Sequence, residues 1–268
     1  MLAENFTAFE YSSQQLKINE MLWHIILQEQ KKKAENEKIA SMSFDEFQAY
    51  FTDKIETSKI LGEHGYIPSM HKSLDDEEEI KRIILNDGTE AQIMNVLFKS
   101  EKDVQNLIEK LDNLTSLKNV QLYFQGFKKQ YGFQDYTASA FYLSSLLDNR
   151  FRFLFRKKDY KTISRFLNEG IEDTKVKHFN ALSQDEKSLL SNVFLLTEFI
   201  PALTSYMDRL FNGDKNAKDH FGKPHYEPVY LERNWLMHGY RTRPVEHYEV
   251  LQLLNAIDAL EEIIDMLK

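Results

Sequence analysis

Apolar side chains recur three or four positions apart along most of this chain, which is the spacing of one face of an α-helix. The clearest run lies near the C-terminus, where a helix from about 244 to 268 carries apolar residues on one side: Val250, Leu253, Leu254, Ile257, Leu260, Ile264 and Leu267. The same spacing predicts helices over 116–130, 136–157 and 183–211, and Pro201 is expected to bend the last of them. The pattern therefore predicts an all-α protein.

Start and stop signals divide these helices. Capping-box sequences, in which a hydroxyl and a carboxyl or amide side chain satisfy free backbone donors, occur at Ser43–Glu46, Thr89–Gln92 and Ser183–Glu186. Gly62, Gly65 and Pro68 are expected to end one helix and open a connection.

The acidic run Asp75–Glu79 precedes an apolar pattern and favours a helix N-terminus, where negative charge is stabilised. A metal site or a surface for a basic partner is the alternative interpretation of this run.

Composition supports the helical prediction and excludes several classes of protein. Gly contributes 9 and Pro 5 of the 268 residues, below the usual shares of about 7% and 5%, whereas a sandwich or Rossmann-type sheet needs many turns. The absence of cysteine excludes disulfides, thiol catalysis and cysteine-ligated metals. No apolar run approaches the length of a membrane span. We therefore expect a soluble, cytoplasmic protein that does not bind membranes.

The net charge is −8, from 34 basic and 42 acidic side chains. Contact with nucleic acid would therefore depend on local basic patches rather than on the overall field.

A long loop rich in turn residues is predicted over 212–228, and Pro228 is expected to open a short helix that ends at Gly239. His220 and His225 lie in this loop beside Asp219 and Glu227 and could ligate a metal. Their spacing fits no helical ligand pair, which favours solvated loop histidines, and we expect neither a metal nor another cofactor.

One motif carries candidate chemistry: Arg233-Asn234-x-x-x-His238, followed by Gly239 and the C-terminal helix. This motif, in this position, resembles the Arg-x(4–6)-His signature of the HEPN superfamily. Residues 115–160, with Ser144–Arg150 near their end, resemble the early helices of bacterial HEPN-like proteins. The resemblance covers roughly 113–268 and implies a HEPN-like helical bundle there. Residues 1–112 would form an additional helical region of unknown role.

The resemblance implies a metal-independent endoribonuclease in which a two-fold dimer brings two motifs into one cleft. Histidine can exchange protons near neutral pH and arginine can stabilise a phosphate as charge builds on it. His238 would be the acid or base, Arg233 the phosphate stabiliser, and Asn234 would orient the histidine or the phosphate. On an ideal helix Arg233 and His238 lie about 140° apart, so a single helix does not form the site alone.

Other interpretations of the motif remain open. Arg233 could pair with Glu232 or with a neighbouring helix, and His238 could cap a helix C-terminus. The chain could be a catalytically silent HEPN-like module that binds RNA, a nucleotide or a partner, or a helical interaction protein. The expected partners are RNA, a second copy of the chain and an antitoxin or regulatory protein. The resemblance implies roles in bacterial defence, stress or toxin–antitoxin systems.

Two groups of basic residues are candidates for RNA contact. Arg241 and Arg243 follow the motif, although segment 228–250 has three basic and three acidic residues and is neutral. Segment 150–161 has six basic residues and one acidic residue among interleaved aromatics, which suits a nucleic-acid backbone and bases. Its candidate contacts are Arg152, Arg156, Lys157 and Lys158. The alternative is a helix that buries Leu147, Phe151, Leu154 and Phe155, with cations at its C-terminal end.

Overall fold

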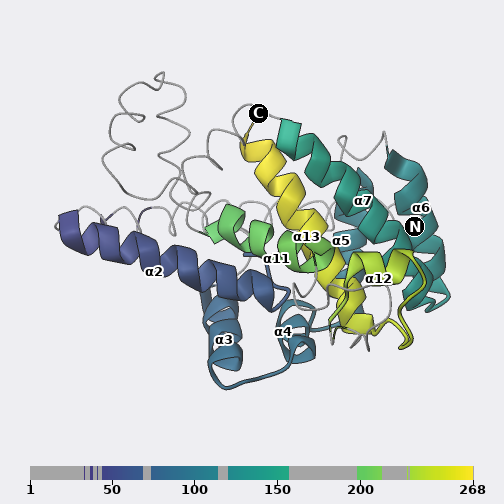
Figure 1. Cartoon of the computed structure of the whole chain (residues 1–268), viewed down its shortest axis with the longest axis horizontal. Coiled ribbons are helices and arrows are strands. Elements are labelled where there is room, and N and C mark those ends of the chain that lie inside the picture. The colour runs from purple at the N-terminus through teal and green to yellow at the C-terminus, as the bar shows by residue number, and fades with distance from the viewer. Residues whose placement is uncertain are drawn as a thin grey trace, which may run out of the picture.

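The computed structural model describes residues 33, 37–38, 41, 44–68, 74–113, 120–156, 198–212, 228 and 230–267. Within these residues the chain is helical and has no strand, so the predicted all-α fold is confirmed (Figure 1). The helices are α2 (Phe44–Glu63), α3 (Leu74–Leu85), α4 (Glu90–Leu97), α5 (Glu101–Asn113), α6 (Gln121–Gly132), α7 (Tyr136–Arg156), α11 (Ile200–Asn212), α12 (Arg233–Met237) and α13 (His247–Met266).

The C-terminal helix α13 is the centre of the molecule. Figure 1 shows α13 crossing the bundle beside α7, which packs in turn against α6, while α2 packs against α11. The apolar side predicted for this helix is buried, from Val250 to Leu267. Residues on its other side, such as Leu251 and Ile263, are buried as well. The helix is therefore buried over most of its surface, and only a narrow stripe that includes Asp265 reaches solvent.

Buried polar residues of α13 find partners on several other elements. Asn255 Nδ2 donates to the Ile67 carbonyl at 3.3 Å, and Gln252 Nε2 donates to Glu90 Oε2 at 2.8 Å. Arg209 of α11 forms an ion pair with the same Glu90 at 2.7 Å. Because a buried polar group without a partner is costly, these pairs fix how α4, α11 and α13 lie together.

The predicted boundary near residue 112 falls at the end of α5. One hydrophobic core includes residues from both sides of it, among them Tyr66, Ile93, Leu143 and Leu260. The division into 1–112 and 113–268 stays a prediction.

Several local predictions are confirmed. The capping box at Thr89 is present, with the Gln92 backbone N–H and the Thr89 backbone N–H both bound. Helix α2 ends at Glu63, and Gly65 follows with φ of +79°, a conformation that glycine adopts without strain. The acidic run Asp75–Glu79 lies in α3 and places its first three members in the first turn.

Other boundaries differ from the predictions. The helix predicted over 116–130 is α6, which begins at Gln121. Pro201 is the second residue of α11, and residues 198–199 directly before this helix are π-helical. The expected bend at Pro201 stays a prediction, and the rest of the predicted 183–211 helix up to 197 lies outside the described residues. Pro228 does not open a helix: α12 begins at Arg233, because Glu232 supplies the cap.

Candidate functional site

The short helix α12 carries the motif, and capping residues at both ends determine where it begins and ends. The Glu232 carboxylate, which is buried, accepts a hydrogen bond from the Asn234 backbone N–H at 3.2 Å. The helix ends at Met237, and Gly239 follows with φ of +70°. Arg233 is therefore the first helical residue and His238 the residue that caps the helix C-terminus, so the prediction of a capping histidine describes its position.

The Asn234 side chain links this helix to α11 by a hydrogen bond. Its Nδ2 donates to the Phe211 backbone carbonyl at 2.7 Å. Phe211 is the penultimate residue of α11, where carbonyls have no partner within the helix. The Asn234 side chain therefore satisfies a free carbonyl and sets the position of α12.

Arg233 lies between α12 and α7. Its Nη2 is 3.7 Å from Asp148 Oδ2, and its guanidinium carbon lies 5.5 Å from the centre of the Phe211 ring. The Nε atom is buried and has no hydrogen-bond partner among the described residues. The side chain remains 25% exposed. The ion pair is long, so the guanidinium keeps donors that a phosphate could use.

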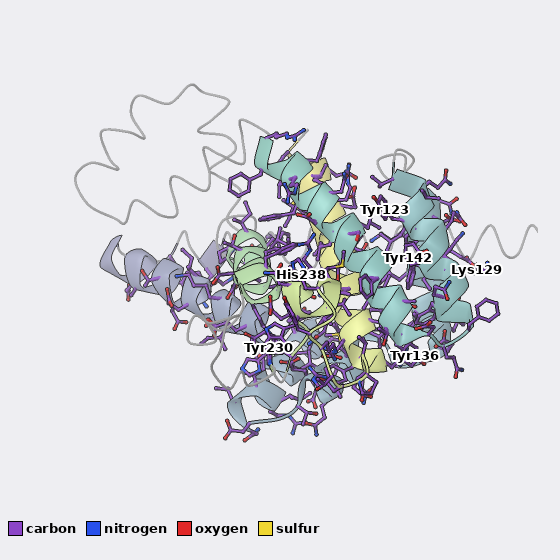
Figure 2. All side chains as sticks on the ribbon, turned by 45° about the vertical axis from the view of Figure 1, so that its right-hand side comes forward. Tyr123, Lys129, Tyr136, Tyr142, Tyr230 and His238 are labelled. Carbon is purple, nitrogen blue, oxygen red and sulfur yellow. The ribbon has the colours of Figure 1, made fainter. Side chains whose placement is uncertain are left out.

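His238 is exposed at the surface next to α11 and α12 (Figure 2). Its backbone N–H donates to the Asn234 carbonyl at 3.0 Å, while its ring lies 6.0 Å from that of Tyr240. No described residue forms a hydrogen bond with the imidazole. Tyr240 is 51% exposed and meets Trp235 edge-on at 6.2 Å. An exposed imidazole beside an exposed aromatic ring is accessible to a substrate.

Arg241 and Arg243 are engaged by a buried carboxylate. Glu249 is fully buried and receives Arg241 Nη2 at 2.5 Å and Arg243 Nη2 at 2.9 Å. It also accepts from the Glu246 backbone N–H at 2.9 Å. These contacts hold the loop after α12 to the start of α13. Only 5% of the Arg241 side chain and 29% of the Arg243 side chain are exposed, and RNA contact through them stays a prediction.

The second basic group lies on the last turns of α7. Arg152 and Arg156 are exposed, whereas Lys157 and Lys158 lie outside the described residues. Arg150 is instead buried and bound to Glu261, with its Nη2 3.0 Å from Oε2. Leu147 and Leu154 are buried as predicted, but Phe155 is 52% exposed. The expected burial of Phe155 is therefore wrong, because α13 and α6 cover other sides of this helix.

Asp148 joins the two groups of candidate residues. Arg152 Nε donates to Asp148 Oδ1 at 2.8 Å, and Arg233 approaches the other oxygen of the same carboxylate. The i,i+4 pair within α7 is visible in the sequence, whereas the contact with Arg233 joins residues 85 positions apart and has no sequence signal. Sequence reasoning also missed Phe211 and Tyr240.

The described residues contain no group of histidines and carboxylates that could hold a metal ion. His220 and His225 lie outside them. None of the helices in the described ranges is long and apolar enough to cross a membrane.

Comparison with models of protein families, with curated proteins and with solved structures found no match to this chain. The resemblance to the HEPN superfamily therefore depends on the motif and its position in a helical chain.

Proposed function

We propose that the protein is a HEPN-like, metal-independent endoribonuclease that acts as a homodimer. The observation that carries the proposal is the arrangement around α12, where Arg233 and His238 lie at the two ends of one short helix. His238 is exposed, and Arg233 is partly exposed with a long ion pair to Asp148. These two side chains supply the two kinds of group that RNA cleavage needs.

The reaction would be attack of a ribose 2′-hydroxyl on the adjacent phosphorus. One neutral histidine takes the proton of the hydroxyl, and a protonated histidine gives a proton to the departing 5′-oxygen. The products are a 2′,3′-cyclic phosphate and a 5′-hydroxyl. One chain contributes one such histidine, so a second copy would supply the other. Arg233 would stabilise the charge on the phosphoryl oxygens, and Asn234 would hold α12 in place.

The test is cleavage of a mixed RNA in excess EDTA by the wild type, His238→Ala and Arg233→Ala. We expect cyclic-phosphate products from the wild type and a loss of rate of about 100-fold or more in both variants. His64→Ala, which removes a histidine at the end of α2, is the matched control and should cleave normally. Cleavage that survives both α12 substitutions would assign the activity to another site.

The dimer is tested separately by sedimentation of the full chain at micromolar concentration. A composite site requires a dimer in the wild type and in His238→Ala. A purely monomeric wild type would contradict the two-copy mechanism, and loss of assembly in His238→Ala would favour a structural role for the motif.

A catalytically silent HEPN-like module is the second candidate, and one observation favours it. Asn234 is occupied by the Phe211 carbonyl, and Arg233 contacts Asp148 and Phe211, so two motif residues already have structural partners. Such a module would bind RNA, a nucleotide or a protein without cleavage. A folded dimer that binds labelled RNA and yields no product in the EDTA assay would support this candidate.

The resemblance to the HEPN superfamily also supports a proposed role in bacterial defence or toxin–antitoxin systems, and with it a cytoplasmic location.

A further inference from the structure

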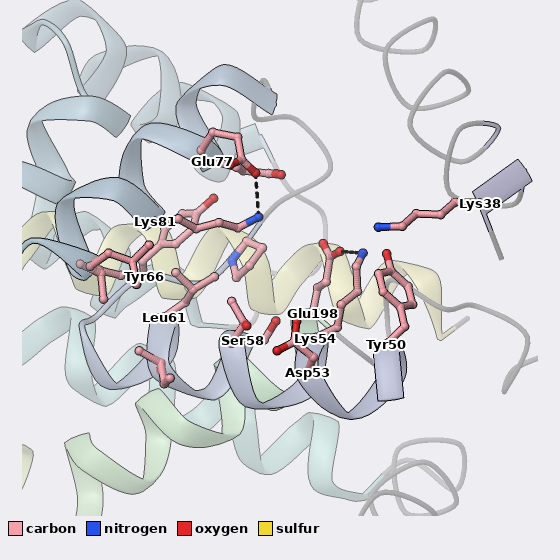
Figure 3. A pocket seen from close by; sticks show the side chains of 16 residues that line it. Lys38, Tyr50, Asp53, Lys54, Ser58, Leu61, Tyr66, Glu77, Lys81 and Glu198 are labelled. Carbon is pink, nitrogen blue, oxygen red and sulfur yellow. Dashed lines mark hydrogen bonds and ion pairs between the residues drawn. The ribbon is translucent and has the colours of Figure 1, made fainter. Parts of the chain in front are cut away.

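Two ion pairs in the pocket between α2 and α3 show what a directly bonded pair looks like in this fold. The pocket has a volume of about 440 Å³, and no residue of α12 lines it (Figure 3). Lys54 Nζ is 2.6 Å from Glu198 Oε1, and Lys81 Nζ is 3.0 Å from Glu78 Oε1. At these distances each ammonium is held by a charge-assisted hydrogen bond, so a charged ligand of either sign would have to displace a partner.

The pair between Arg233 and Asp148 is different, because it lacks a direct hydrogen bond. Arg233 Nη2 is 3.7 Å from Asp148 Oδ2, which is too far for such a bond. Arg233 Nη1 donates a long hydrogen bond of 3.4 Å to Asn234 Oδ1, and the guanidinium carbon lies 5.5 Å from the centre of the Phe211 ring. The guanidinium is therefore oriented mainly by the nearby charge and by an aromatic face, and no short bond occupies its Nη atoms.

The Asp148 carboxylate is itself held from its other side. Arg152, one helical turn further along α7, donates from Nε to Asp148 Oδ1 at 2.8 Å. The Asp148 side chain is only 20% exposed, whereas Arg152 is 70% exposed. Arg152 offsets the negative charge of the carboxylate, so a phosphate that approaches Arg233 meets two cations and one anion. The carboxylate can therefore orient Arg233 without repelling the phosphate from the site.

We propose that Asp148 is a positioning residue for RNA cleavage: its carboxylate orients the Arg233 guanidinium, and Arg233 contacts the phosphate. This inference rests on the proposed function. A guanidinium that is oriented before charge builds on the phosphoryl oxygens needs no reorganisation at the moment of reaction. Loss of the Asp148 charge would leave Phe211 and Asn234 as the groups that orient Arg233. The guanidinium would then be less well aligned with the phosphate.

The experiment measures kcat and KM for RNA cleavage in excess EDTA by the wild type, Asp148→Asn, Arg233→Ala and the double variant. A displacement of about 1 Å can cost about 100-fold in rate, and since Phe211 and Asn234 remain, we expect Asp148→Asn to lower kcat about tenfold. KM should change by less than about twofold, because the lost interaction acts in the transition state. The double variant should be no slower than Arg233→Ala, because no guanidinium is left to orient.

Two further variants separate positioning from a general loss of charge or of structure. Asp112→Asn, which removes a carboxylate that pairs with Lys128 at 2.6 Å, is the matched control and should cleave as the wild type does. Asp148→Glu keeps the charge and should retain more of the rate than Asp148→Asn. The pH profile of kcat should be the same in the wild type and in Asp148→Asn, because the carboxylate acts on Arg233 rather than on His238. Circular dichroism confirms that each variant is folded.

Other results overturn the inference in distinguishable ways. A wild type that does not cleave RNA would remove the proposed function, and the role of Asp148 with it. If the wild type cleaves and the effects of Asp148→Asn and Arg233→Ala multiply, only this inference fails, because Asp148 then acts independently of Arg233. An Asp148→Asn variant as fast as the wild type would also contradict it. A faster one would show that the carboxylate competes with the phosphate for Arg233.

Discussion

At the scale of single residues, His247 shows how burial changes the pKa of a histidine that no sequence motif singles out. Its Nε2 lies 2.8 Å from the Tyr131 hydroxyl, and its ring stacks on Tyr136 at 4.9 Å. Burial lowers the pKa of His247 below 6.5, and the nearby Glu101 carboxylate opposes that effect only in part. The folded chain therefore favours the neutral imidazole over the charged one.

This preference predicts a pH dependence of stability. The folded state binds this proton less readily than the unfolded state does, so the contribution of His247 is complete above about pH 6.5 and is lost as pH falls through the lowered value. Chemical denaturation of the wild type and His247→Gln between pH 7.5 and 5 should show a difference in unfolding free energy that shrinks toward low pH. A constant difference would mean that His247 titrates alike in both states.

Arg241 and Arg156 are both candidate RNA contacts in the sequence, but their substitution should change stability by different amounts. Arg241→Ala leaves the buried Glu249 carboxylate with one guanidinium fewer, and we expect a loss of about 3 kcal/mol, the lower end for a broken buried pair, since Arg243 remains. Arg156→Ala, at the exposed end of α7, should change stability by less than about 0.5 kcal/mol. Urea denaturation measures both. Equal effects would contradict the buried network.

At the scale of elements, α2 and α11 approach each other closely at Gly62. A Cβ built on Gly62 would lie 2.1 Å from the Ala202 carbonyl oxygen, so only glycine allows the two backbones to lie this close. Helix α11 packs against α2 and, at its C-terminal end, accepts the hydrogen bond from Asn234 through the Phe211 carbonyl. The position of α12 therefore depends on the packing of α11 against α2.

Alanine substitution of two helical glycines, one at this contact and one away from it, tests how tightly the two helices pack. Gly62→Ala should force α2 and α11 apart and destabilise the fold by about 1–3 kcal/mol or more, as overpacking does. Gly132→Ala meets no atom within 4 Å and should be neutral or stabilise by up to about 1 kcal/mol. Thermal melting of both variants checks the pair. A harmless Gly62→Ala would show that the helices can separate without cost.

At the scale of the whole molecule, α13 connects the two halves of the chain. Asn255 and Gln252 bind groups before residue 112, whereas the Glu261 side chain binds Arg150 after it. A fragment limited to 113–268 would leave buried residues of α13 exposed and Asn255 without its carbonyl partner. We expect such a fragment to lose the cooperative unfolding of the full chain, as followed by circular dichroism and urea. A fragment that folds and unfolds cooperatively would support the boundary at 112.

The sequence by itself determined the helical class, several of the helix ends and the residues of the motif. It could do so because apolar spacing, capping groups and glycine conformations act within a few residues, as at Thr89 and Gly65. Only the tertiary structure decided that α13 is central rather than superficial, that Glu249 occupies Arg241 and Arg243, and that Asp148 meets Arg233. Those outcomes depend on contacts between residues far apart in the chain, which no local pattern of the sequence specifies.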